Sequence, residues 1–349
     1  MEHSRKEHPL AGRVALVAGA TRGAGRGIAR ELAAAGAKVY CTGRSTLAHP
    51  ATAGRPETID ETAQLIIDAG GIAVAVRVDH TKEEEVAALA ARLRADEGRL
   101  DVLVNDIWGG DDLVDWSAKF WTLDMATVRA LVDQAVFSHL ITSRHLAPLM
   151  VEAKRGLIVE VTDGELSGYR GQLLYDFVKA SVNRLAYAMA WDLARTGVSA
   201  LAVSPGFLRS EAMLDRFGVT EANWRDAVKG DAAFAYSETP RYIGRAIAAL
   251  AADPDVGRKS GQALFVDALA DEYGFTDVDG ESPRFWRNIE AWLDQQMAAG
   301  GKLAPEARRM AAARYGQIHL SPAHAGQARR YAVALGLAEL GAGLRPATG

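Results

Sequence analysis

The sequence contains a single cysteine, Cys41, among its 349 residues. One cysteine excludes an intrachain disulfide, and its position inside an apolar run indicates a small core residue rather than a redox centre. Histidine pairs with metal-ligand spacing on a helix are also lacking, because His139 and His145 lie six residues apart and His319 and His324 lie five apart. We therefore predict no metal site and no thiol-based redox chemistry.

Excess charge and long apolar runs are lacking as well. The net charge of −4 and an isoelectric point near 6.1 provide no basic stripe for nucleic acid or for an anionic membrane. No stretch approaches the ~20 apolar residues of a membrane span, and the first ten residues lack the apolar centre of a signal peptide. We therefore expect a cytoplasmic protein with no nucleic-acid partner and no membrane contact. With 49% hydrophobic and 24% charged residues, the composition is that of a globular protein.

The clearest pattern that is present lies in RVALVAGATRGAGRGIAREL, residues 13–32. Its apolar run is typical of a parallel strand buried on both faces. Gly19, Gly23 and Gly25 follow, and glycines let the backbone approach a pyrophosphate that the N-terminus of the next helix attracts. A second strand begins about 20 residues further on, as a dinucleotide-binding βαβ unit requires. The sequence thus predicts a cofactor loop to which Thr21 and Arg22 also contribute.

The end of the second strand, residues 37–42, indicates which dinucleotide binds. An acidic residue near this point holds the ribose 2′-hydroxyl of NAD, whereas an arginine suits the 2′-phosphate of NADP. Gly43 removes the acid, Arg44 can meet the phosphate as a charged fork, and Arg22 adds a second cation. We therefore predict NADP (NADPH) as the cofactor. The alternative is that Arg44 is a solvated loop charge.

Apolar runs alternate with segments of helical spacing along the rest of the chain. Further strands are expected at residues 72–78, 100–104, 157–161, 199–203 and 263–266, and a long helix at 128–150. This alternation predicts an α/β fold, a Rossmann-type doubly wound parallel sheet with helices on both faces. We assign residues 1–280 to one dinucleotide-binding and catalytic domain and residues 281–349 to a helical C-terminal extension. An apolar stripe predicts that the extension packs on the body or on a partner subunit: Phe285, Trp286, Ile289, Trp292, Leu293 and Met297.

Tyr175 and Lys179 lie four residues apart in a segment with helical spacing, so that their side chains share one face. Reducing a carbonyl needs a hydride and a proton, and a tyrosine of pKa ~10 serves at neutral pH only if its phenolate is stabilised. Lys179 supplies that positive charge and can also hold the cofactor ribose. The hydroxyl of Thr162, thirteen residues before Tyr175, can hydrogen-bond the substrate oxygen. The alternative is a core aromatic beside a solvated lysine.

Together, the glycine spacing, the Thr162–Tyr175–Lys179 spacing and a Pro-Gly turn after the sixth strand resemble the short-chain dehydrogenase/reductase superfamily over about residues 10–279. The resemblance implies that Asp79 contacts the adenine amine, although a helix N-cap is an equal alternative. It also implies that Asn105 braces the sheet edge near the adenine. Three further residues are expected at the nicotinamide carboxamide: Pro205, Gly206 and Ser210.

Several residues depart from the superfamily's pattern. Asp106 and Ile107 replace the usual residues after Asn105, and Thr162 replaces a serine. Ala135, with Gln134 beside it, stands where a relay asparagine is usual. Glu160 is an acid inside an apolar strand, which we expect to form a structural hydrogen bond or to tune the site.

The substrate end of the site is expected to be aromatic. Trp108 follows the fourth strand, Phe207 follows the Pro-Gly turn, and residues 208–236 lie where the superfamily has a substrate lid, whether mobile or packed as a flap.

We therefore expect an enzyme, an NADP(H)-dependent oxidoreductase that reduces a carbonyl or oxidises an alcohol on a small apolar or cyclic substrate, with Tyr175 as acid/base. We expect a homo-oligomer, either a dimer or a tetramer. Two alternatives come from other classes of protein. The departures at Ala135, Asp106 and the Thr162–Asp163 pair leave open a non-catalytic NADP-binding sensor or scaffold. The extra acids Glu160, Asp163 and Glu165 leave open a lyase or isomerase on the same fold.

Overall fold

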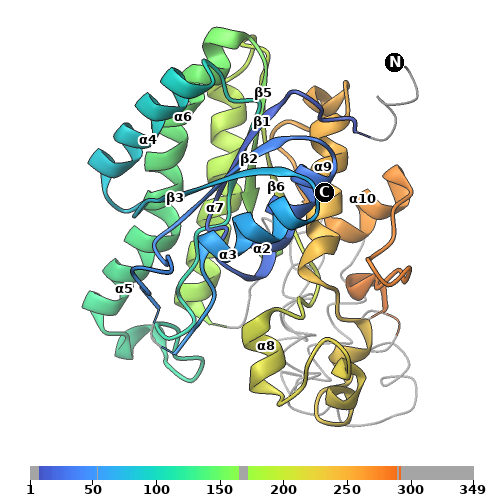
Figure 1. Ribbon diagram of the computed structural model, residues 1–349. Helices are drawn as coiled ribbons and strands as arrows, with labels where there is room; N and C mark the ends of the chain where they lie inside the picture. Colours follow the sequence, from blue (N-terminus) through green and yellow to red (C-terminus); the bar gives the residue numbers. More distant parts are fainter. Residues whose placement is uncertain (1–7, 53, 165–171, 289–290, 292–349) are drawn as a thin grey trace, which may run out of the picture.

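The computed structural model describes residues 8–52, 54–164, 172–288 and 291 (Figure 1). Seven strands form one parallel sheet in the order β3-β2-β1-β4-β5-β6-β7. This order confirms the predicted Rossmann-type doubly wound fold. The first three strands are added toward one edge of the sheet and the later strands toward the other, so the strand order reverses between β1 and β4. The strands are β1 Val14–Ala18, β2 Lys38–Gly43, β3 Ile72–Arg77, β4 Val102–Asn105, β5 Gly156–Val161, β6 Val198–Ser204 and β7 Ala263–Phe265.

Helices cover both faces of the sheet. The α-helices are α2 Gly23–Ala34, α3 Ile59–Asp68, α4 Glu83–Asp96, α5 Met125–Val132, α6 Ser138–Ala153, α7 Leu173–Asp192, α8 Glu211–Arg216, α9 Pro240–Ala252 and α10 Val266–Tyr273. Shorter segments are η1 Phe120–Thr122, η2 Asp133–Phe137, η3 Trp224–Lys229, η4 Ala232–Tyr236 and η5 Val256–Lys259. Figure 1 shows α4 and α6 on one side of the sheet and α9 and α10 on the other.

The two faces of the sheet carry separate cores because successive strand residues point to opposite sides. On β1, Val17 packs with Ile28 of α2 and Ile247 of α9, whereas Leu16 packs with Leu93 of α4 and Leu146 of α6. Strands buried on both faces read as continuous apolar runs, as parallel strands between two helical layers should. The core therefore fixes the carboxyl ends of β1, β4 and β5 beside one another.

The long helix expected at residues 128–150 is confirmed, because the backbone stays helical from Met125 to Ala153, although it contains one π-helical turn. α5 ends at Val132, a π-helical turn follows as η2, and α6 begins at Ser138. The side chain of Gln134 donates to the carbonyls of Trp108 and Gly109, at 2.9 and 2.6 Å. Insertions of this kind recur at functional sites. Here the bulge ties the helix to the loop after β4.

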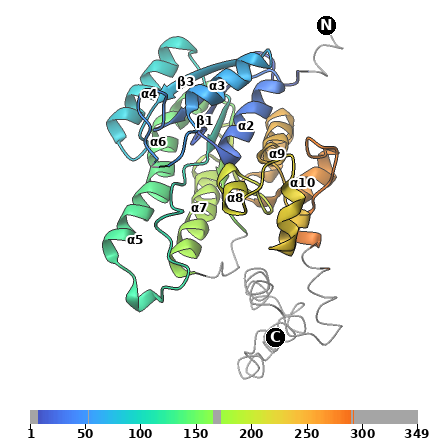
Figure 2. The ribbon, with the colours of Figure 1, turned by 60° about the horizontal axis from the view of Figure 1, so that its bottom comes forward.

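The segment after β6 is a packed flap. α8, η3 and η4 surround a small apolar cluster that includes Trp224 and Phe234, both buried. Figure 2 shows α8 close to α2. The start of this flap contacts the start of α2, because the Glu211 carboxylate accepts a hydrogen bond from the Gly23 N–H.

Only the first residues of the expected C-terminal stripe belong to the described part of the chain. Phe285 and Trp286 are buried and pack against the body, Phe285 on Phe207 and Trp286 on Phe265. Ile289, Trp292, Leu293 and Met297 lie outside the described residues, and the boundary at residue 280 stays a prediction. No helix among the described residues is long and apolar enough to cross a membrane.

Candidate functional site

The glycine loop and the residues after β4 meet where the strand order reverses, which is where open α/β sheets bind ligands. A Cβ atom on Gly19 would lie 2.2 Å from the carbonyl oxygen of Asp106, and one on Gly25 would lie 2.2 Å from the carbonyl oxygen of Gly19. Gly23 adopts a positive φ of 55°. At Gly19 and Gly25 no side chain fits without a backbone shift, and the positive φ of Gly23 favours glycine, so the loop is built around bare backbone.

The N-terminus of α2 already binds an anionic group from the chain itself. The backbone N–H of Gly23 donates to the carboxylate of Glu211 at 2.8 Å, and Arg26 pairs with the same carboxylate at 3.4 Å. This carboxylate stands in for a phosphate, because both are oxyanions that a helix N-terminus attracts. Ser210, beside Glu211, approaches a Cβ position on Gly23 to 3.7 Å. The predicted residues Gly23, Gly25 and Ser210 thus converge on an anion-binding cradle that fits a dinucleotide pyrophosphate.

Asp106 borders this cradle at the end of β4. Its Oδ2 atom lies 2.9 Å from a Cβ position on Gly25, beside the first turn of α2. Burial raises the pKa of the Asp106 carboxyl to about 7, although the positive charge of Lys179 opposes the shift. The carboxyl can therefore hold a proton near neutral pH, where an ordinary aspartate is charged.

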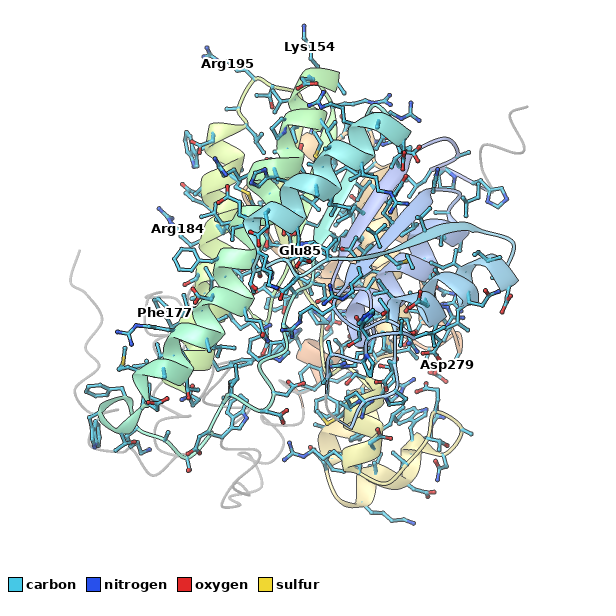
Figure 3. The ribbon with its side chains drawn as sticks, turned by 60° about the vertical axis from the view of Figure 1, so that its left-hand side comes forward. Glu85, Lys154, Phe177, Arg184, Arg195 and Asp279 are labelled. Atoms are coloured by element: carbon cyan, nitrogen blue, oxygen red, sulfur yellow. The ribbon has the colours of Figure 1, made fainter. Side chains whose placement is uncertain are left out.

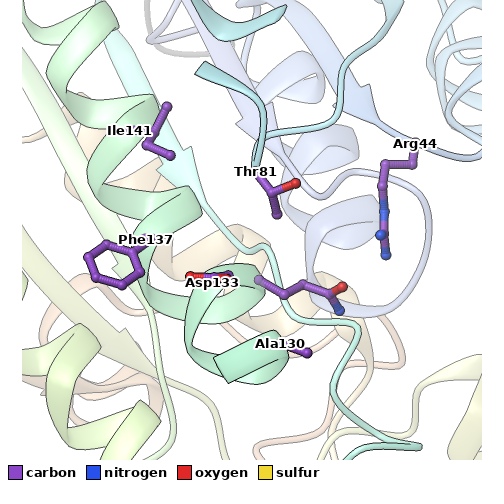
Figure 4. Close-up of a pocket in the computed structure, with 7 residues that line it drawn as sticks. Arg44, Thr81, Ala130, Asp133, Phe137 and Ile141 are labelled. Atoms are coloured by element: carbon purple, nitrogen blue, oxygen red, sulfur yellow. The ribbon is translucent and has the colours of Figure 1, made fainter. Parts of the chain in front are cut away.

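Figure 4 shows Arg44 facing a pocket across from Thr81 and Asp133. Arg44, at the end of β2, lines a cavity of about 530 Å³ together with Thr81 and with residues of α5, η2 and α6. Gly43 leaves room for the hydroxyl of Thr21, which a Cβ there would meet at 2.8 Å. The structure therefore places Thr21 and Arg44 side by side at the end of β2. The predicted Arg22 is the N-cap residue of α2; among the described residues its side chain forms no capping hydrogen bond, and its carbonyl accepts from the Arg26 N–H at 3.3 Å.

Asp79 is engaged in its own loop. Its carboxylate accepts hydrogen bonds from the backbone N–H and the hydroxyl of Thr81, at 3.1 and 2.7 Å. Burial acts to raise the pKa of Asp79, but these bonds and the charge of Arg44 outweigh it and lower the pKa. The N-cap residue of α4 is Lys82, so Asp79 closes the turn before the helix. An adenine contact by Asp79 stays a prediction.

Tyr175 and Lys179 lie on α7 and enclose Trp108 between them. The Lys179 Nζ atom is 4.2 Å from the centre of the Trp108 ring, and that ring is 5.5 Å from the Tyr175 ring in an edge-on arrangement. Trp116 packs on Tyr175 from the other side, at 5.0 Å. The pair therefore shares one helix face, and aromatic side chains surround it.

Thr162 points away from this group, and Asp163 points into it. The Thr162 hydroxyl is buried and donates to the backbone carbonyl of Lys179 at 3.0 Å, whereas the Tyr175 hydroxyl donates to Asp163 Oδ2 at 2.7 Å. Successive residues at the end of an extended strand face opposite ways, so only one of the two can face Tyr175. The structure thus brings together Tyr175, Lys179 and Asp163, with Thr162 holding the helix behind them. The alternation of side chains along β5 was the sequence signal that could have identified Asp163 as the residue that faces Tyr175.

A buried polar network braces the sheet edge beneath this group. Asn105 and Glu160 are partners in the β4–β5 register, and the Asn105 amide donates to Glu160 at 2.7 Å and to Ser143 at 2.9 Å. The second Glu160 oxygen lies 2.5 Å from His139 Nδ1, and His139 Nε2 lies 2.9 Å from the carbonyl oxygen of Ile107. Glu160 therefore forms the structural contacts that its sequence position required. The role of His139 was not visible from the sequence.

The Pro205–Gly206 turn is held from behind by the C-terminal segment. The Trp286 indole N–H donates to the Pro205 carbonyl at 3.2 Å, and a Cβ on Gly206 would lie 2.5 Å from Phe285 and 2.7 Å from Glu238. Burial, with Asp267 nearby, raises the pKa of Glu238 well above its ordinary value. Gly206 is therefore required by close packing on its far side.

Among the described residues, no group of three or more His, Cys, Asp or Glu side chains could hold a metal ion.

Comparison with known proteins places this site in a family. A model of the family described as short chain dehydrogenase matches residues 13–217. The mouse protein named dehydrogenase/reductase SDR family member 1 is 34% identical over 297 residues, which cover 84% of this chain and 91% of the mouse protein. The crystal structure of a hydroxysteroid dehydrogenase from Escherichia coli is 26% identical with a TM-score of 0.59, covering 75% of this chain and 97% of the other.

A second solved structure, a putative NAD(P)-dependent gluconate 5-dehydrogenase from Beutenbergia cavernae with bound NADP, is 29% identical with a TM-score of 0.58. The similarity covers 74% of this chain and 97% of that one.

Proposed function

Because the chain belongs to the short-chain dehydrogenase family and is an oxidoreductase of that family, we propose that it uses NADPH to reduce a carbonyl group on a small cyclic or apolar substrate. One observation carries the proposal. The anion-binding glycine loop and the Tyr175–Lys179 pair both border the segment after β4, because Asp106 lies against Gly25 and Trp108 contacts both Tyr175 and Lys179. A hydride donor bound to the loop would therefore lie beside a proton donor.

A nicotinamide cofactor held by the glycine loop would provide the hydride for the carbonyl carbon. Tyr175 donates its hydroxyl proton to the carbonyl oxygen, as a general acid held in place by the rings of Trp108 and Trp116. Lys179 brings its positive charge within 5.7 Å of the Tyr175 ring, which favours the phenolate left after proton transfer. The rings of Trp108 and Trp116 offer an apolar surface that suits a ring-shaped or apolar substrate.

Arg44 supports the choice of NADP over NAD. It lines an open cavity at the end of β2, and Gly43 leaves no acid there to repel a 2′-phosphate. Gly19, Gly23 and Gly25 would hold the pyrophosphate. Asn105 would contribute by bracing the carboxyl ends of β4 and β5 near the adenine. Pro205, Gly206 and Ser210 would face the nicotinamide. The bound NADP of the Beutenbergia structure agrees with this proposal.

Exposed apolar side chains on η2, α6 and α7 support a homo-oligomer. Phe137, Leu140 and Phe177 are 49%, 42% and 54% exposed, and Figure 3 shows Phe177 and Arg184 along the outer side of α7. A face of this kind is typical of an interface between subunits. Light scattering on the purified protein should give the mass of a dimer or tetramer, and a monomer at all concentrations would refute this part of the proposal.

The reaction is tested by following NADPH oxidation near ~340 nm with a panel of cyclic and open-chain ketones. We expect turnover with the wild type and a loss of 100-fold or more, on the order of a general acid's contribution, in Tyr175→Phe. Full activity in Tyr175→Phe would refute its role. Cofactor binding without turnover on any ketone or alcohol would instead favour a sensor, and product formation without NADPH oxidation would favour a lyase or isomerase.

A further inference from the structure

The first residue of the flap helix α8 reaches into the glycine loop. The Glu211 carboxylate accepts a hydrogen bond from the Gly23 N–H at 2.8 Å and lies 3.4 Å from the Arg26 guanidinium. Both partners belong to the start of α2, and Figure 2 shows α8 near that helix. An oxyanion of the chain is therefore bound where we propose that a dinucleotide phosphate binds.

Several contacts keep Glu211 in this position. Ser210 is the N-cap residue of α8, and its side chain caps the first turn of that helix. The side chains of Arg26 and Glu211 are 12% and 28% exposed, so solvent screens their attraction only in part. Further along α8, Asp215 pairs with Arg55 at 2.5 Å, although its exposure of 69% makes this second pair weak. The start of the flap is thus anchored on the glycine loop, chiefly through Glu211.

A phosphate and this carboxylate cannot share the start of α2. The Gly23 N–H carries one hydrogen, which points at Glu211 Oε2. A phosphate oxygen that accepted the same hydrogen would come within hydrogen-bond distance of the carboxylate oxygen. Two negative charges this close repel each other wherever water screens them only partly. Binding of one anion at this place therefore weakens binding of the other.

We propose that Glu211 is a built-in competitor of the cofactor, and that a dinucleotide phosphate displaces its carboxylate from the Gly23 N–H in order to bind. The inference rests on the proposed cofactor site and adds a residue that lowers the affinity of that site. Because Glu211 is the first residue of α8, the same displacement releases the start of the flap. Binding at the glycine loop is thereby coupled to the flap, residues 208–236.

The size of the effect follows from the contacts that Glu211 makes. Competition reduces the apparent affinity for the cofactor to the fraction of molecules in which Glu211 is displaced. A hydrogen bond to a charged group, together with a partly screened ion pair, favours the bound carboxylate by on the order of five- to thirtyfold. Removing the carboxylate should therefore tighten cofactor binding by that factor. A residue that supports the cofactor would have the opposite effect, so the sign of the change identifies the role.

Fluorescence titration of NADPH into the wild type, Glu211→Gln and Glu211→Ala tests this sign. Glutamine keeps the shape without the charge, and alanine removes the contact entirely. We expect both variants to lower the Kd for NADPH by on the order of five- to thirtyfold. Inorganic pyrophosphate, titrated by calorimetry, should gain affinity in the same direction, since it carries only the phosphates.

Asp226→Asn is the matched control. It removes one carboxylate from the same flap, but this carboxylate pairs with Lys229 at 3.8 Å and not with the glycine loop. Its Kd for NADPH should stay within about twofold of the wild type, because an exposed pair contributes little.

Hydrogen exchange followed by mass spectrometry tests whether α8 is released. Pyrophosphate should raise deuterium uptake in residues 211–216 of the wild type, because it displaces Glu211 and has no nicotinamide to hold the flap. Glu211→Gln should show the raised uptake before any ligand is added, and pyrophosphate should change it no further. Unchanged uptake in the wild type at saturating pyrophosphate would overturn the displacement.

The outcomes separate this inference from the proposed function. Equal or weaker NADPH binding in both Glu211 variants would overturn the inference and leave the reductase proposal standing. Binding of NADPH to none of the proteins would refute the proposed cofactor and the competition with it. Tighter binding by the variants, with no ketone reduced by any of the proteins, would support the competition and count against the reductase proposal alone.

Discussion

The substitution Asp106→Asn should stabilise the protein above neutral pH. Asp106 lies against the glycine loop, and burial raises its pKa from 3.8 to about 7. A shift of about 3 units at about 1.4 kcal/mol each corresponds to roughly 4 kcal/mol against the charged carboxylate. Because Asp106 keeps part of its surface exposed to solvent, which screens its charge, we expect about 2–4 kcal/mol. Asparagine has the same shape without the charge, so the variant should gain this free energy of unfolding near pH ~8.

The sign of the pH dependence follows from the direction of the shift. Between pH 3.8 and about 7 the folded protein holds more protons at Asp106 than the unfolded chain does. The favourable contribution is complete below the unfolded pKa and is lost as the pH rises through about 7, with a slope of at most about 1.4 kcal/mol per pH unit. The variant lacks this slope, so its advantage over the wild type should grow across that window and then level off.

Urea unfolding followed by tryptophan fluorescence at a series of pH values measures the effect. Asp115→Asn is the matched control, because its exposed carboxylate accepts hydrogen bonds from Ser117 and has a lowered pKa. Its removal should give no gain near pH ~8. Equal stability of wild type and Asp106→Asn across the range would show that the Asp106 carboxyl ionises normally, and the reasoning would fail.

Three further outcomes are expected. Arg44→Ser should raise the Kd for NADPH by on the order of tenfold or more and leave that for NADH within about twofold, by fluorescence titration, since only NADPH has the 2′-phosphate; equal losses would remove Arg44 from that role. Gly25→Ala should lower stability by about 1–3 kcal/mol and abolish NADPH binding, because its Cβ would lie 2.2 Å from the Gly19 carbonyl; normal binding would contradict the cradle. Glu160→Leu should cost about 3–5 kcal/mol in urea unfolding, since it strands His139 and Asn105, and a neutral result would refute the bracing role.

Periodicity and glycine spacing were enough to predict the layers of the fold and the position of the loop. Strands buried on both faces leave an unmistakable apolar run, as in Val14–Ala18, and the reversal between β1 and β4 follows from the order of the elements. The π-helical turn at residues 133–137 could not be foreseen, because the bonds of its Gln134 side chain to the carbonyls of Trp108 and Gly109 form only in the folded chain.

Part of the candidate site could likewise be predicted from the sequence, and part could not. Tyr175 and Lys179 are four apart on one helix, so their shared face follows from local geometry. Side chains alternate between the two faces of a strand, so either Thr162 or Asp163 can face them, depending on which face the last residue of β5 points to. The spacing from Thr162 to Tyr175 does not decide this. The occupation of the Gly23 N–H by Glu211 joins residues 188 positions apart, which only the folded chain brings together.

The bond from Trp286 to Pro205 also orders events during synthesis. The sheet from β1 to β6 is encoded before residue 205, and domains generally fold as the chain emerges. The Pro205–Gly206 turn, however, waits for a partner 81 residues later in the sequence. The two sides of the cleft therefore become complete at different times during synthesis. Its glycine loop can form while the ribosome is still working, whereas its opposite wall is secured only once Phe285 and Trp286 have been made.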